Sequence, residues 1–215
     1  MREVNLMGQI YANAHTVLVW LGEDSNNIAK KAFGFLMEYN KHVEKELQNA
    51  HQLETGEILM RMPSLNGNHC LRKNLGGWIA CKELLSMPWF RRVWVLQEVG
   101  LAQRARAYLG VSEISFADVV LFCVLVSTWR KRDVPDDIGL AVGMIGDAFI
   151  SIWPGYAINR PRTWMKDDNK LLRMLTGLSE AVAPKSWDEI LHAGRNFQST
   201  EKVDHIYAFL GHPTC

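Results

Sequence analysis

The sequence predicts an α/β fold that is mostly helical and contains a small, mostly parallel sheet. Residues 16–21 are a short apolar run rich in β-branched side chains, ended by Gly22, which is typical of a strand buried on both faces. Residues 104–110 alternate at first between polar and apolar side chains and predict a second short strand. Elsewhere apolar residues recur at spacings of three and four, which predicts helices.

The elements follow in order along a single domain spanning residues 1–215. Residues 50–76 are irregular and predict a flexible insertion. The strand at 16–21 needs a parallel neighbour, and we expect its first partner to lie before Met1, which makes the sheet incomplete at its N-terminal side. Ser25 is the expected N-cap of the second helix and Ser115 that of an apolar helix, and residues 186–189 form a capping box. The expected helices are at 1–14, 25–49, 78–85, 90–101, 116–129, 136–154, 171–178, 187 onward and 203–210.

Composition excludes several classes of protein. The 215 residues are 48% hydrophobic and 22% charged with a net charge of +1, so the chain is neither disordered nor globally attracted to nucleic acid. Apolar runs are too short to span a membrane, and no secretory signal opens the chain. The four cysteines form no CxxC pair, which favours the cytoplasm, and no metal site is expected. Eight tryptophans indicate either a large aromatic core, which we favour, or a ligand-stacking surface.

Residues 88–99 concentrate polar and aromatic side chains in an otherwise apolar stretch. On one continuous helix, Arg91, Trp94 and Glu98 share a face. Burial of Gln97 and Glu98 costs free energy unless they are paired. Glu98 is therefore either tied to an arginine or to backbone N–H groups and organises the core, or it is a carboxylate held beside aromatic side chains in a cleft. In the second case it could stabilise a cationic, oxocarbenium-like sugar centre beside a stacked base. The residues alone favour the ion pair.

A second candidate site follows the first strand directly. Glu23 and Asp24 lie at its carboxyl end, where open α/β sheets bind ligands. The alternative is an ordinary solvated turn, with the acids favoured near the next helix N-terminus.

Three stretches resemble the fungal heterokaryon incompatibility (HET) domain, in order and rough spacing: residues 9–22, 88–102 and 204–211. The matching positions are Tyr11, Trp20 and Gly22 in the first, Trp89, Phe90, Arg92, Trp94, Gln97 and Glu98 in the second, and Asp204 and Tyr207 in the third. The family's opening strand with a WIDxxCINQ-like segment is absent upstream of Gln9, and Val203 stands where the third motif usually has arginine. The resemblance therefore implies an N-terminally truncated HET-like domain.

The resemblance implies a fold related to TIR domains and a role in fungal non-self recognition and programmed cell death. It implies action through self-association or protein partners, with no cofactor. Because some TIR domains cleave NAD with a glutamate, it also implies NAD as a conceivable substrate, with Glu98 as the catalytic carboxylate. Three functional hypotheses stay open at this point: a signalling module, an NAD glycohydrolase and an inactive degenerate fragment.

Overall fold

A computed structural model of the chain describes residues 2–49, 70–129, 142, 145–146 and 186–210. The helices expected at 136–154 and 171–178, most of the predicted insertion and the helix end at Gly211 lie outside the described residues. Of that insertion, Cys70–Lys73 is the short helix α4, and residues 75–76 open the next helix.

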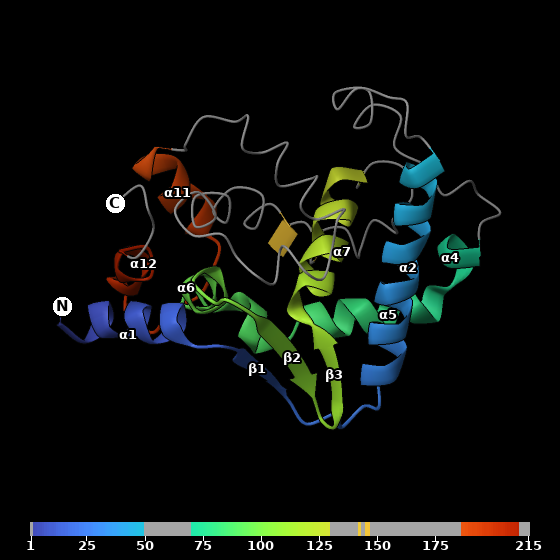
Figure 1. The fold of residues 1–215 in the computed structure, drawn as a ribbon, viewed down its shortest axis with the longest axis horizontal. Helices are drawn as coiled ribbons and strands as arrows, with labels where there is room; N and C mark the ends of the chain where they lie inside the picture. Colours follow the sequence, from blue (N-terminus) through green and yellow to red (C-terminus); the bar gives the residue numbers. More distant parts are fainter. Residues whose placement is uncertain (1, 50–69, 130–141, 143–144, 147–185, 211–215) are drawn as a thin grey trace.

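The sheet has three described strands in the order β1-β2-β3 (Figure 1). β1 (Val17–Gly22) runs parallel to β2 (Ala105–Leu109), and β2 pairs antiparallel with β3 (Ser112–Ser115). The described sheet is thus mixed, whereas we expected it to be mostly parallel. The expectation was wrong because it did not include the hairpin between β2 and β3. β1 has its parallel neighbour inside the chain, whereas we expected that partner before Met1.

The two faces of β1 differ in exposure. Val17, Val19 and Leu21 point into the core, while Leu18 and Trp20 on the other face are exposed. The expectation of a strand buried on both faces was therefore wrong. A single-sided strand alternates in this way, and here the exposed positions carry large apolar side chains that hide the alternation in the sequence.

Three helices build the main core beside the sheet: α2 (Ala29–Asn49), α5 (Leu75–Leu85) and α7 (Phe116–Trp129). Figure 1 shows α2 and α5 crossing on the right-hand side of the molecule, with α7 beside α2 and above the sheet, and α2 also packs directly against β3. Trp78 of α5 is fully buried, and its ring centroid lies 4.9 Å from that of Phe35 and 5.6 Å from that of Tyr39. Its indole N–H donates to the carbonyl of Leu71 at 3.0 Å.

The prediction that the tryptophans form an aromatic core is confirmed for some of the tryptophans that the structure describes. Trp78 is buried, and Trp89, Trp94 and Trp187 are partly buried against the core. Trp20 is exposed, because it stands on the outer face of β1.

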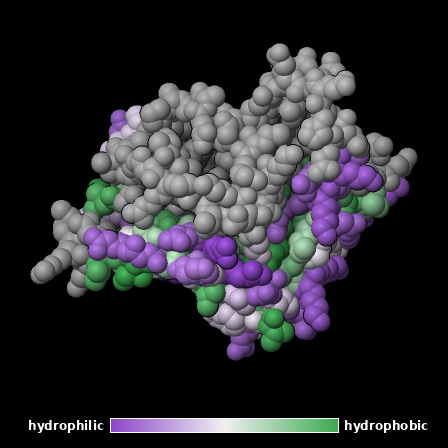
Figure 2. Space-filling view, in the orientation of Figure 1, coloured by the Kyte–Doolittle hydropathy of each residue, from purple (hydrophilic) through white to green (hydrophobic). Residues whose placement is uncertain are grey.

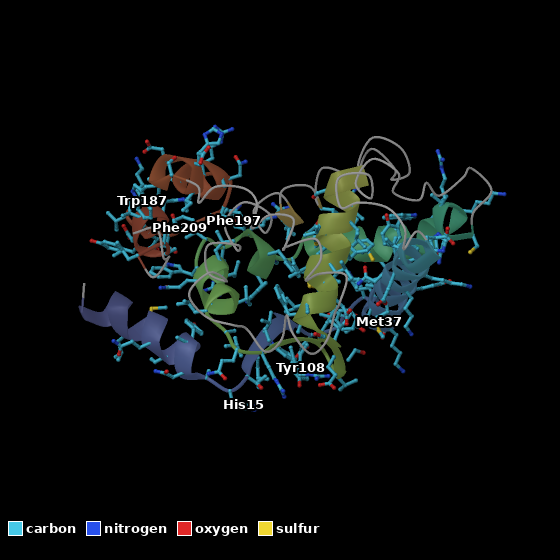
Figure 3. The ribbon with its side chains drawn as sticks, turned by 45° about the horizontal axis from the view of Figure 1, so that its top comes forward. His15, Met37, Tyr108, Trp187, Phe197 and Phe209 are labelled. Atoms are coloured by element: carbon cyan, nitrogen blue, oxygen red, sulfur yellow. The ribbon has the colours of Figure 1, made fainter. Side chains whose placement is uncertain are left out.

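The remaining described elements gather at the other end of the molecule. They are α1 (Arg2–Asn13), the 3-10 turn η1 (Pro88–Arg91), α6 (Val95–Gly100), α11 (Trp187–Gly194) and α12 (Asp204–Tyr207). The capping box predicted at Ser186 is confirmed, since its hydroxyl accepts from the Glu189 N–H and the Glu189 carboxylate accepts in return from the Ser186 N–H. Trp187, Phe197 and Phe209 lie together at this end (Figure 3). No described helix is both long enough and apolar enough to cross the membrane.

Two helical glycines provide a matched test of this packing. A Cβ on Gly77 would lie 2.2 Å from the Phe35 ring, whereas a Cβ on Gly34 of α2 would meet nothing within 4 Å. Gly77→Ala should therefore lower the free energy of unfolding by about 1–3 kcal/mol through overpacking. Gly34→Ala should raise it by about 0.5–1 kcal/mol, because alanine favours the helix. Chemical denaturation measures both, and equal effects of the two variants would contradict this packing.

Candidate functional site

The candidate site forms where α1 packs against α6. The contact is close because Gly8 of α1 has no side chain: a Cβ there would lie 3.2 Å from Nε2 of Gln97 and 3.6 Å from Cδ1 of Leu101. A glycine inside a helical pattern often marks such an approach, so Gly8 is the sequence signal for this contact. One helical turn after Gly8, the Tyr11 side chain comes within electrostatic range of Glu98.

A break in the chain places Arg92 beside Glu98. The helix expected over residues 90–101 is interrupted: η1 ends at Arg91, Arg92 is extended with ψ 134°, and α6 begins at Val95. The expected helical face of Arg91, Trp94 and Glu98 is therefore wrong. Instead, Nη2 of Arg92 lies 3.6 Å from Oε1 of Glu98.

The backbone of Arg92 is held in this extended form by a segment distant in sequence. Arg92 and Gln198 form an isolated parallel β-bridge, in which the Val93 N–H donates to the Gln198 carbonyl at 2.9 Å. The Gln198 N–H donates in turn to the Arg91 carbonyl. Helical spacing in residues 90–101 cannot reveal this bridge, because it depends on a partner about a hundred residues away.

We call the group of Tyr11, Arg92 and Glu98 the Glu98 cluster. The Glu98 side chain is only 13% exposed, whereas that of Arg92 is 54% exposed. Burial raises the pKa of Glu98, and the Arg92 guanidinium offsets part of that rise. Burial, followed by the nearby Glu98 carboxylate, also raises the pKa of Tyr11, which Arg92 lowers. The cluster thus holds a carboxylate whose charged form its surroundings disfavour.

Gln97 adds a second unfavourable group next to the Glu98 cluster. Its side chain is 1% exposed, and its Oε1 atom accepts no hydrogen bond within the part of the chain that the structure describes. A buried acceptor without a donor costs about 1–3 kcal/mol. Two consecutive residues of α6 therefore lower stability, which is a pattern more typical of functional sites than of core packing.

Other motif positions have structural roles. Trp89 and Phe90 pack with Phe116 of α7, the Trp89 ring lying 5.2 Å from that of Phe90 and 5.4 Å from that of Phe116. Trp94 is partly buried and stands at the N-cap of α6. Gly22 ends β1 with φ 125°, a conformation that glycine adopts without strain.

The third motif does not contribute its two predicted residues, Asp204 and Tyr207, to the Glu98 cluster. Asp204 and Tyr207 are half-buried in α12, which packs against α11. Within the described residues, neither makes a hydrogen bond or ion pair with Arg92 or Glu98.

The acidic turn after β1 acts as a helix cap. Asp24 Oδ1 accepts from the Ile28 N–H at 2.7 Å, and both carboxylate oxygens accept from the Ala29 N–H at 3.2 Å. Asp24, rather than the expected Ser25, therefore provides the capping side chain of α2. The β2–β3 turn approaches the same place, since the Gly110 N–H donates to the Gly22 carbonyl at 2.9 Å. These contacts favour the turn interpretation over ligand binding, with Glu23 exposed beside it.

The described residues contain no group of three or more His, Cys, Asp or Glu side chains placed to hold a metal ion.

The raised pKa of Glu98 predicts how stability depends on pH. In the unfolded chain a glutamate has a pKa of about 4.3. Because the pKa of Glu98 is higher in the folded state, the folded state binds the carboxyl proton more tightly than the unfolded state at pH values between the two pKa values. The free energy of unfolding then falls as pH rises through this window, and the loss persists at neutral pH. Glu98→Gln carries no charge, so it should be more stable than the natural chain near neutral pH and lose that advantage below about pH 4. Urea denaturation across this pH range measures the difference, and a less stable variant at neutral pH would contradict the burial argument.

Comparison with known proteins gives one family match. Residues 1–98 match the model of a protein family described as heterokaryon incompatibility protein (HET). This match confirms the resemblance for the first motif and for the second as far as Glu98, and it includes the whole Glu98 cluster, while the third motif lies outside the matched residues. Searches of curated proteins and of solved structures found no match.

Proposed function

We propose, from the match of residues 1–98 to the model of the heterokaryon incompatibility (HET) family, that the protein is a signalling component of fungal non-self recognition. In this proposal it acts inside the cell, through self-association or a protein partner, and triggers programmed cell death. We further propose that its fold is related to TIR domains, which the parallel pairing of β1 with β2 supports.

The Glu98 cluster is the proposed functional centre. The observation that carries this proposal is the Glu98 carboxylate, which is 13% exposed and lies 3.6 Å from the Arg92 guanidinium. Its partial burial disfavours the charged form and raises its pKa. The three residues of the Glu98 cluster come from the two sequence motifs within the family match. Tyr11 of the first motif lies on α1, and the second motif, with Arg92 and Glu98, spans η1 and α6. A group that lowers stability is retained more readily where function requires it.

Inducible expression of the full chain in a filamentous fungus tests the signalling role. We expect growth arrest and cell death on induction, and weaker killing by Trp78→Ala, which destabilises the core and lowers the amount of folded protein. Normal growth with folded protein present at high level would contradict the proposal and favour an inactive fragment.

Cleavage of NAD is the second candidate function, and the same carboxylate favours it. In this reaction the bond between the ribose C1 atom and the nicotinamide nitrogen breaks, and neutral nicotinamide leaves. A carboxylate at Glu98 would stabilise the oxocarbenium-like centre until the oxygen of water bonds to C1, giving ADP-ribose and a released proton. The neighbouring Arg92 guanidinium would supply a positive charge for such a substrate.

Incubation of purified, concentrated protein with NAD distinguishes the two candidates. Loss of NAD that falls about 100-fold or more in Glu98→Gln supports the enzyme. If the purified protein leaves NAD unchanged and its expression still kills cells, the protein signals through protein contact alone.

A further inference from the structure

Phe197 and Gln198, which follow α11, join the C-terminal part of the chain to the second motif, and we call these two residues the strap. Phe197 anchors the strap, because its side chain is 5% exposed and its N–H donates to the Gly194 carbonyl at 3.1 Å. Gln198 is exposed and contacts the second motif through its backbone. Its N–H donates to the Arg91 carbonyl, and its carbonyl accepts from the Val93 N–H at 2.9 Å. A variant that changes only the Gln198 side chain therefore leaves these hydrogen bonds in place.

The strap fixes the backbone of Arg92. Its two hydrogen bonds are made to the residues on either side, so Arg92 forms the β-bridge with Gln198 and is extended, with φ −76° and ψ 134°. The chain is helical immediately before and after this residue, because η1 ends at Arg91 and Trp94 has φ −64° and ψ −25°. Arg92 cannot take the helical ψ of about −42° while it forms this extended bridge.

The local sequence favours a helix at the place where the strap interrupts it. Apolar residues from Phe90 to Leu101 recur at spacings of three and four, and Pro88 precedes them at a position that suits the first turn of a helix. One backbone angle, the ψ of Arg92, thus separates the broken conformation from a continuous helix over residues 88–101. Hinges in proteins are often one or a few residues that absorb a large change of this kind.

The two conformations place the Arg92 side chain differently. In the broken form its Nη2 atom lies 3.6 Å from Oε1 of Glu98. On a continuous helix the two residues would be about 120° apart around the axis and about 9 Å apart along it, which separates the pair. Arg92 is already 54% exposed, and Figure 2 shows hydrophilic residues at the surface around α1, at the end of the molecule where Figure 1 places α1 and α6. Its guanidinium can therefore turn into solvent, and Glu98 would then lose its positive neighbour.

We propose that the strap is a positioning element of the Glu98 cluster. While the strap is docked, Arg92 lies beside Glu98; when the strap is released, residues 88–101 form one helix and Arg92 leaves the carboxylate. This regulation rests on the proposed function of the Glu98 cluster. It links the third motif to the cluster without direct contact, because α12 packs against α11 and α11 leads into the strap. A rearrangement of α11 and α12 thus reaches Glu98 through Arg92.

NMR titration of the Glu98 carboxyl carbon in the purified full chain tests the proposal. Gln198→Pro removes the N–H donor to the Arg91 carbonyl, and the matched control Gln198→Ala keeps it. Gln198→Pro should raise the pKa of Glu98, because the Arg92 guanidinium that lowers it moves away, whereas Gln198→Ala should leave it unchanged. General loosening of the fold would instead lower the pKa towards the unfolded value of about 4.3. An unchanged or lowered pKa in Gln198→Pro, or an equal rise in Gln198→Ala, would overturn the proposal.

Arg92→Gln shows whether the strap acts through Arg92. This variant should raise the pKa of Glu98 by itself, and Gln198→Pro added to it should cause no further rise. A further rise as large as that in the natural chain would overturn the proposal. Tyr11 of α1, which also acts on Glu98, is unchanged in all these variants. If Gln198→Pro does not fold, Phe197→Leu weakens the anchor while keeping every backbone donor; it should raise the pKa of Glu98 by a smaller amount, and the absence of any rise would overturn the proposal.

These titrations need no cell killing, so the strap and the proposed function can fail separately. If Glu98→Gln abolishes killing but Gln198→Pro does not raise the pKa of Glu98, the strap is overturned and the functional centre stands. If Gln198→Pro raises that pKa but folded Glu98→Gln still kills cells, the strap is supported and the functional centre is overturned.

Discussion

Trp78→Ala should lower the free energy of unfolding by about 3–5 kcal/mol, a large share of the roughly 5–15 kcal/mol that stabilises an ordinary domain. Trp78 is fully buried among Phe35, Tyr39 and Phe122, which come from two other helices. Truncation leaves a cavity between α2, α5 and α7, and it also removes the N–H donor to the Leu71 carbonyl. The loss therefore combines packing with a hydrogen bond.

Two further tryptophan variants make this prediction specific. Trp78→Phe retains most of the ring but not the donor, so it should cost about 1–3 kcal/mol. Trp20→Ala removes an exposed ring and should change stability by about 0.5 kcal/mol or less at low protein concentration. Chemical denaturation gives all three values, and equal losses for Trp78→Ala and Trp20→Ala would show that the core is elsewhere.

Most described elements were predictable because their patterns are local. The helices α1, α2, α5 and α7, the strands β1 and β2, and the capping box at Ser186 follow from spacing, caps and turn residues within each segment. The β2–β3 hairpin was missed because β3 has only four residues, with Ile114 as its single buried side chain.

The candidate site was less predictable because it depends on contacts between distant segments. Sequence spacing identified Glu98 and suggested a pairing with an arginine or with backbone N–H groups, but it placed Arg91 on the face of Glu98 along a continuous helix. The Gln198 backbone holds Arg92 extended and thereby brings Arg92 to Glu98 instead. The approach of Tyr11 depends on Gly8, whose role becomes clear only when α1 is packed against α6.

Replacement of Glu98 by glutamine should separate function from stability. The variant keeps the size of the side chain but removes the charge that burial disfavours, so the protein should stay folded and become more stable near neutral pH. If the Glu98 cluster is the functional centre, the same variant should lose cell killing completely. The matched control is Glu113→Gln, which removes an exposed glutamate that also pairs with an arginine, and it should kill as the natural chain does.

Colony formation after induction of Glu98→Gln, at a level of folded protein equal to that of the natural chain, tests the central claim most directly. We predict that cells expressing Glu98→Gln form as many colonies as cells without the protein, while cells expressing Glu113→Gln or the natural chain form few. Killing by folded Glu98→Gln at the natural level would contradict the claim that the Glu98 cluster is the functional centre.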